Sequence, residues 1–273
     1  MHHLRPKRAL LLTLVLVLAP GLAAATELPG GPAFLKAADD VIAAQGEAGV
    51  SPPPPITDPR VQTLLARAAN IEAIFGNVKL TAADLGPVMD LCGKTNQITV
   101  GYALANIASL KPPAGQTADP EALKPRVIEL QSRNVIAYQD AIVPMGAFSA
   151  RCMMRALPLL TEFMRTLPAE QRTPVRMGGL RQMRGGVANM MVGAITSSIQ
   201  TGISAANRHL AVSAAADVAS TFAAILPVAD RKVIQQTAVR VRPSAAAADQ
   251  PSLDTIARAF ADERCEGLCA LGS

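Results

Sequence analysis

Aromatic side chains are scarce in this sequence. Its 273 residues include no tryptophan, two tyrosines and six phenylalanines. A buried core therefore has to be filled by alanine, leucine, valine, isoleucine and methionine, and the shorter of these let helices approach closely. Few aromatics also leave few platforms on which bases or sugars stack, which argues against a protein that binds nucleic acids or glycans by stacking.

Histidine is almost as scarce. His209 is the only histidine beyond the first three residues, so it is the one candidate for a Ser-His-Asp or Cys-His arrangement. The sequence also lacks the G-x-S-x-G, H-E-x-x-H, Walker and G-x-G-x-x-G motifs, and the C-x-x-C-H motif of covalent haem attachment. We interpret His209 as a polar surface residue beside Arg208, and predict no catalytic, metal or cofactor site.

Strand signals are missing as well. No segment shows a run of alternating β-branched residues or an Asn-Gly or Asp-Gly hairpin. Apolar residues instead recur at helical spacing, as Val61, Leu64 and Ala68 do. The sequence therefore predicts an all-α fold, a multi-helix bundle of about six to eight helices with kinks at prolines such as Pro158.

Helix starts are marked by residues whose side chains cap free backbone N–H groups. Thr81 and Asp84 have the spacing of a capping box. The remaining predicted caps are Asp58, Asp119 and Ser252, and further helices are predicted to start at Thr173 and Ser204.

The first 25 residues have the pattern of a cleavable secretory signal. A basic head precedes an apolar run over residues 9–19, and Ala23–Ala25 form a small-residue cleavage site without a lipoprotein cysteine. The apolar run is shorter than the ~20 residues of a membrane span, which makes an uncleaved anchor the weaker alternative. We predict export to the periplasm or the medium with cleavage after Ala25, and no transmembrane span in the mature chain.

The charge balance changes once this signal is removed. The whole chain has 26 basic and 21 acidic residues, and Arg5, Lys7 and Arg8 of the signal carry three of the basic charges. The mature chain is thus nearly neutral, with a formal charge of about +2. That balance argues against nucleic acid as a partner.

Three segments follow the predicted signal peptide, residues 1–25. Residues 26–57 are predicted to form one helix, over 34–44, and a linker whose Pro52–Pro55 run is a stiff spacer or, alternatively, a docking site for a proline-binding partner. Residues 58–242 are predicted to form the helical domain. Residues 243–273 are predicted to form an alanine-rich linker and a C-terminal helix that ends in a cysteine clip.

Four cysteines remain in the predicted mature chain, and an even number in an oxidising compartment indicates two disulfides. Four cysteines allow three connectivities. We favour Cys92–Cys152, because both lie on or beside the apolar stripes of neighbouring helices. Cys265–Cys269 is then a local clip, favoured by its close spacing and by Gly267.

The densest basic stretch begins at Arg165 and contains four further arginines. No acidic residue interrupts this stretch after Glu170. We expect it to contact an envelope protein or an anionic envelope surface; the alternative is a solvated helix end paired with acids elsewhere. The candidate patch consists of Arg172, Arg176, Arg181 and Arg184.

Residues 185–207 contain no charged side chain. We interpret them as a central buried helix rather than a membrane-inserting hairpin, because Asn189, Ser197 and Gln200 reduce the hydropathy. Their glycines and alanines also allow a cavity between the helices of residues 185–226, and helical bundles bind small molecules in such cavities.

The function expected from these patterns is that of a non-enzymatic interaction or accessory protein of the cell envelope. The alternatives are a helical bundle that binds a small apolar ligand and, ranked last, an enzyme without a recognised motif. The frequent methionines are interpreted as adaptable core filler rather than Cu(I) ligands, because close Met-x-Met spacing is missing.

Overall fold

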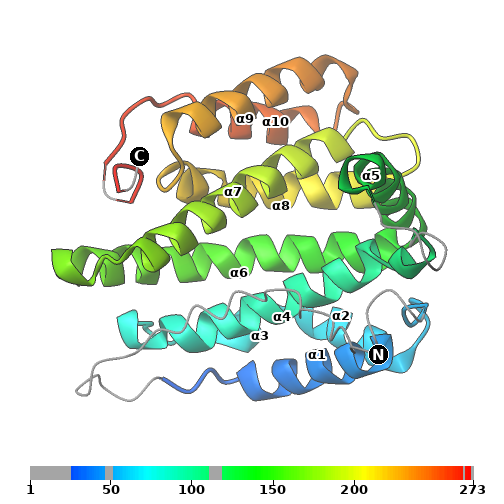
Figure 1. The fold of residues 1–273 in the computed structure, drawn as a ribbon, viewed down its shortest axis with the longest axis horizontal. Helices are drawn as coiled ribbons and strands as arrows, with labels where there is room; N and C mark the ends of the chain where they lie inside the picture. Colours follow the sequence, from blue (N-terminus) through cyan, green and yellow to red (C-terminus); the bar gives the residue numbers. More distant parts are fainter. Residues whose placement is uncertain (1–25, 47–51, 111–118, 267, 272–273) are drawn as a thin grey trace.

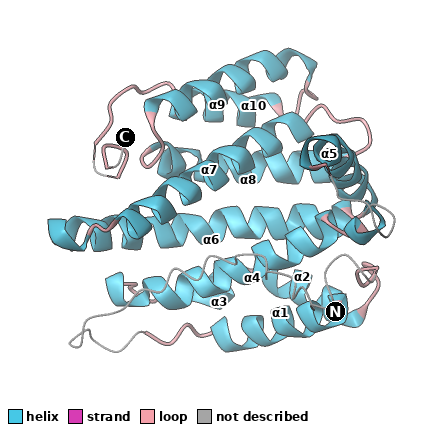
Figure 2. Ribbon diagram, in the orientation of Figure 1, coloured by secondary structure: helices cyan, strands magenta, loops and turns pink. Residues whose placement is uncertain are grey.

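The structure, a computed structural model, describes residues 26–46, 52–110, 119–266 and 268–271. The described residues form ten α-helices and four short 3-10 helices, with no strand (Figure 2). The all-α prediction is confirmed, but the helix number exceeds six to eight. Eight helices lie within residues 58–242, and one more precedes and one follows them. The predicted signal peptide, residues 1–25, lies outside the described residues.

The N-terminal helices form one side of the molecule (Figure 1). They are α1 (Gly31–Gln45), α2 (Pro59–Ala68), α3 (Ile71–Phe75) and α4 (Leu85–Ala103). Asp58 caps α2 as predicted, because its side chain accepts a hydrogen bond of 2.9 Å from the Arg60 N–H. The 3-10 helix η1 (Ala82–Asp84) carries the predicted capping box and leads into α4.

The longest helix, α6 (Gln139–Thr166), runs through the middle of the molecule between α4 and α8 (Figure 1). It continues as one helix through Pro144 and Pro158. Fifteen of its side chains are buried, which makes it the central element of the core. The preceding helix, α5 (Pro120–Ala137), lies across one end of the bundle (Figure 1).

The C-terminal helices cover the other side of α6. They are α7 (Pro174–Ser197), α8 (Ala205–Ala223), α9 (Val228–Val241) and α10 (Gln250–Ala259). The remaining 3-10 helices are η2 (Ile107–Leu110), η3 (Ala169–Gln171) and η4 (Arg242–Ser244).

Of the predicted starts of α5, α7, α8 and α10, the structure confirms three. Asp119, Thr173 and Ser204 accept backbone N–H groups at the starts of α5, α7 and α8. The predicted cap Ser252 is wrong, because α10 begins at Gln250 and its N-cap position is Asp249, three residues earlier.

One hydrophobic core extends over all three predicted segments. Phe34 of α1 is fully buried and stacks on Phe148 of α6 with ring centroids 4.6 Å apart. Leu253 and Ile256 of α10 are fully buried in the same core. The boundaries at residues 57 and 243 stay predictions, but the helices beyond them pack as parts of the bundle.

The proline run is packed against the bundle. Pro53 and Pro54 are buried, and the Tyr102 hydroxyl of α4 donates a 2.7 Å hydrogen bond to the Pro54 carbonyl. Desolvation of that hydroxyl raises the pKa of Tyr102 to about 12. The described part of the run, from Pro52 to Pro55, is therefore a docked connector rather than a free spacer.

Two disulfides stabilise the fold, and both are the pairings that the sequence favours. Cys92 and Cys152 join α4 to α6, with an S–S distance of 2.03 Å. Cys265 and Cys269 close a short loop after α10. Within the described ranges, no helix combines the length and the hydropathy that a membrane crossing requires.

Candidate functional site

A groove of about 490 Å³ lies where α5, α6, α7 and α8 meet, with Thr99 of α4 at its edge. This volume is within the range of pockets that hold small molecules. The groove lies among the helices of residues 185–226, where the sequence analysis placed a possible cavity.

The groove exists because the helices that form it carry small residues toward one another. From α6, Gly146, Ala147 and Ala150 line it, and from α8, Ala211 and Ala214 do. Close-packed interiors normally fill the space between helices with longer side chains. Alanine and glycine on facing helices instead leave an open space.

Apolar side chains make up most of the remaining wall. Ile142 and Val143 contribute from α6, and Met190 and Met191 from α7. Ile128 of α5 also lines the groove, with 63% of its surface exposed. The lining therefore suits the apolar part of a ligand.

Polar groups of the groove are hydroxyls and amides. The hydroxyls of Ser132, Thr196 and Ser197 donate to carbonyls of their own helices, so their oxygens can still accept hydrogen bonds. Gln131 and Gln200 also line the groove, and their side-chain amides form no hydrogen bond within the described part of the chain. No described residue of the lining carries a charge, so the groove suits an uncharged ligand.

Specific hydrogen bonds hold α5 against the bundle. The Asn134 side-chain amide donates to the carbonyls of Ala103 and Ala105, at 3.0 and 2.9 Å. At the start of α6, Gln139 accepts a hydrogen bond from the Ser204 N–H and donates to the Gly202 carbonyl. These contacts tie α5 to the end of α4, and the start of α6 to the start of α8.

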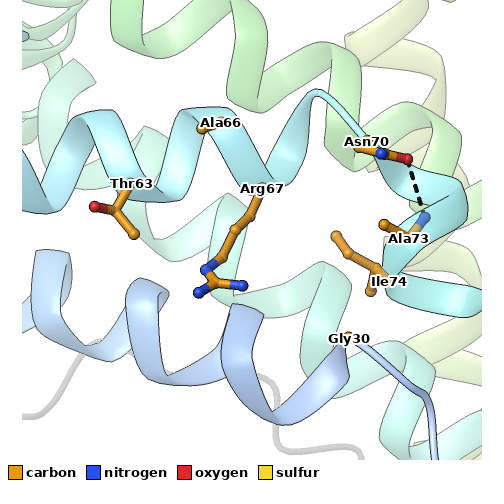
Figure 3. Close-up of a pocket in the computed structure, with 7 residues that line it drawn as sticks. All are labelled: Gly30, Thr63, Ala66, Arg67, Asn70, Ala73 and Ile74. Atoms are coloured by element: carbon orange, nitrogen blue, oxygen red, sulfur yellow. Dashed lines mark hydrogen bonds between the residues drawn. The ribbon is translucent and has the colours of Figure 1, made fainter.

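A second pocket, of about 440 Å³, lies between α1, α2 and α3 (Figure 3). Its polar groups mostly serve the fold. The Asn70 side chain caps α3 by accepting the Ala73 N–H at 3.0 Å, and the Gly30 N–H donates to the Ile74 carbonyl. Arg67 is the one charged side chain of its described lining. The pocket offers fewer unused polar groups than the groove.

The predicted arginine patch does not present four guanidinium groups to solvent. Arg184 is only 2% exposed and donates a 2.8 Å hydrogen bond to the Leu271 carbonyl. Arg172 is half-buried, and Arg176 donates to the Gln171 carbonyl, so Arg181 is the most exposed member. The expectation fails for Arg184 because α7 turns that side chain toward the C-terminal segment.

Arg184 is one of two deeply buried arginines among the described residues, and both donate to carbonyls of the segment after α10. Arg231 of α9, 3% exposed, donates to the Arg264 carbonyl at 2.8 Å. Buried side-chain nitrogens of both residues have no hydrogen-bond partner. Burial lowers the pKa of Arg184, and the opposing effect of Asp230 is smaller. Sequence reasoning missed Arg231, whose neighbours in the chain give no sign of its burial.

His209 has a partner that the sequence did not indicate. Its Nδ1 lies 2.8 Å from Oδ1 of Asp249, a carboxylate whose side chain is 3% exposed. The pair joins α8 to the start of α10. No serine or cysteine of the described residues hydrogen-bonds to His209, and the described chain contains no cluster of three metal-ligating side chains of the His, Cys, Asp and Glu types.

Comparisons with other proteins give no family for this chain. No protein-family model matches it, and neither a curated protein nor a solved structure is similar to it at a significant level. Its function is therefore inferred from its own geometry.

Proposed function

We propose that this protein is exported and that it binds a small, uncharged, predominantly apolar molecule in the groove between α5, α6, α7 and α8. The observation that carries the proposal is a groove of about 490 Å³ with an apolar wall and no charged lining residue among those described. Bundles place small-molecule sites between their helices in this way.

The composition of the lining supports this choice of ligand. The apolar wall favours transfer of an alkyl or ring system from water, at roughly 25 cal/mol per Å² of apolar surface buried. The amides of Gln131 and Gln200 supply donors and acceptors for a neutral polar group. A carboxylate or ammonium ligand would be desolvated there without a counter-charge, which is costly.

Export is the second part of the proposal. It is supported by the signal pattern of residues 1–25 and by the Cys92–Cys152 and Cys265–Cys269 disulfides, which persist in oxidising compartments. We infer cleavage after Ala25 and a periplasmic or secreted location. A ligand binder there takes its ligand from the envelope or the medium.

The contact with an anionic envelope surface, expected from the sequence, loses its main support. It required a cluster of accessible arginines, and Arg184 is buried while Arg172 is half-buried. The groove instead favours the ligand-binding function.

The test compares ligand binding by the exported natural chain with binding by a variant whose groove is filled. Gly193 lines the groove and a Cβ added there meets no atom within 4 Å, so Gly193→Phe adds a ring at the groove wall without a clash at Cβ. Titration with the neutral fluorophore Nile red and with monoacylglycerols should give saturable binding to the natural chain. We expect Gly193→Phe to weaken it at least tenfold.

Gly185→Phe is the matched control. Gly185 lies on the same helix, outside the groove, and has equally open space around an added Cβ. It should leave binding unchanged. Equal binding by the natural chain and Gly193→Phe, or no saturable binding to the natural chain, would rule out the groove as the site.

A further inference from the structure

Asp84 is a buried carboxylate at the junction of η1 and α4, with 0% of its surface exposed. Its Oδ2 accepts hydrogen bonds from the N–H and the hydroxyl of Thr81, at 2.6 and 2.9 Å. Its Oδ1 accepts a hydrogen bond of 2.5 Å from the backbone nitrogen of Thr26, 58 residues away in the sequence. Three donors from two segments therefore converge on this one side chain.

These donors are uncharged in the uncleaved chain. No ion pair among the described residues includes Asp84. Burial raises the pKa of Asp84, but the hydrogen bonds from Thr26 and Thr81 outweigh it and the net direction is downward from 3.8. At neutral pH the fold thus holds a buried negative charge without a positive partner, which is a costly arrangement.

Thr26 is the first residue after the predicted cleavage site. Hydrolysis of the Ala25–Thr26 peptide bond leaves Ala25 with a carboxylate and gives Thr26 a free α-amino group. A free α-amino group has a pKa of about 7.7–8.0 and is largely protonated at neutral pH. The nitrogen that contacts Asp84 would then carry the missing positive charge.

The segment that follows Thr26 is also fixed to the bundle. Leu28 is buried in the core, and the Gly30 N–H donates a 3.0 Å hydrogen bond to the Ile74 carbonyl. A Cβ at Gly30 would lie 2.6 Å from the Ala73 carbonyl oxygen, so the backbone there packs directly against α3. Thr26 is therefore held next to Asp84 by its neighbours in the sequence.

We propose that signal cleavage after Ala25 creates an ion pair between the new Thr26 α-ammonium group and the Asp84 carboxylate, and that this pair anchors the mature N-terminus. The fold gains this charged contact only after signal cleavage. The inference rests on the export part of the proposed function and is independent of the ligand groove.

The experiment compares two exported full-length chains, the natural one and one with a glycine inserted between Ala25 and Thr26. Cleavage after Ala25 leaves Thr26 at the N-terminus of the natural chain and the added glycine at the N-terminus of the other. The intact mass of each mature chain verifies this. The insertion moves the charge away from Asp84 but keeps an amide nitrogen in its place. We expect the unfolding equilibrium constant in urea to rise roughly tenfold, the difference between a charged and a neutral hydrogen bond.

Asp84→Asn completes the cycle. When the glycine insertion is combined with Asp84→Asn, it should have no further effect, because no carboxylate remains to pair with the ammonium group. An equal loss with and without Asp84→Asn, or no loss in either case, would overturn the ion pair. A mature mass that begins at another residue would overturn the cleavage site as well, while binding of Nile red would still report on the groove.

A second measurement covers the case in which Asp84→Asn does not fold. The rate of N-terminal acylation at neutral pH reports how freely the α-amino group loses its proton. We expect the natural mature chain to react at least tenfold more slowly than the glycine-inserted chain. Equal rates would contradict the proposal.

Discussion

At the scale of single residues, the role of a charged side chain depends on its burial as well as on its charge. Arg184 and Arg181 lie three residues apart on α7, yet Arg184 is buried and Arg181 is exposed. The guanidinium group of Arg184 makes one hydrogen bond, to Leu271, and two of its nitrogens have no partner. A buried charge with so few partners contributes little to stability.

Replacing Arg184 by methionine tests this interpretation. An apolar side chain of similar length removes the desolvation cost, so we expect Arg184→Met to leave stability unchanged or to raise it by up to about 4 kcal/mol. Urea denaturation monitored by circular dichroism measures the change.

Arg181→Met is the control for that substitution. It alters an exposed position of the same helix and should stay within about 0.5 kcal/mol of the natural chain. A loss of more than about 2 kcal/mol in Arg184→Met alone would show that its contact with Leu271 anchors the C-terminal segment.

At the scale of elements, α1 is the helix whose observed packing differs most from its predicted role. It was predicted as part of an N-terminal extension, but it buries Phe34, Ala38 and Val41 completely. Its polar face makes ion pairs of small value, such as Lys94 of α4 with exposed Asp39. The apolar face therefore holds α1 in the bundle.

Phe34→Ala measures how much α1 contributes. Loss of the stacked contact with Phe148 and creation of a cavity should lower the free energy of unfolding by about 3–5 kcal/mol. The control is Lys36→Ala on the same helix, which breaks only the exposed pair with Asp40 and should cost less than about 1 kcal/mol. A small effect of Phe34→Ala would mean that α1 detaches without unfolding the rest.

At the scale of the whole molecule, the two disulfides constrain chain segments of very different length. Cys92–Cys152 spans 60 residues and ties α4 to the central helix α6. Cys265–Cys269 spans four residues. The entropy that a cross-link removes from the unfolded chain grows with the length of the loop it closes.

Replacing both cysteines of a disulfide by alanine should therefore destabilise the protein by different amounts for the two disulfides. We expect a loss of about 4 kcal/mol without Cys92–Cys152 and about 2 kcal/mol without Cys265–Cys269. Denaturant titration of the two double variants, each with the other disulfide intact, gives the comparison. The reverse order would show that native contacts, rather than loop length, set these contributions.

The sequence by itself determined the all-α class and most of the helix starts. It favoured the two cysteine pairings, but the structure was needed to choose among the three connectivities. These features depend on short-range physics: residues three and four apart share a helix face, and a capping side chain reaches a nearby N–H. Asp58 and Thr173 cap their helices for this reason, and Cys92 was paired because helical spacing places it beside a core stripe.

Only the tertiary structure decided which surfaces face one another. It brought Asp249 to His209, turned Arg184 inward and placed the small residues of α6 and α8 around one groove. It also placed Thr26 beside Asp84, across 58 residues of chain. Helical periodicity gives the face of each helix but not its neighbour, because helix pairing depends on side-chain shapes far apart in the sequence.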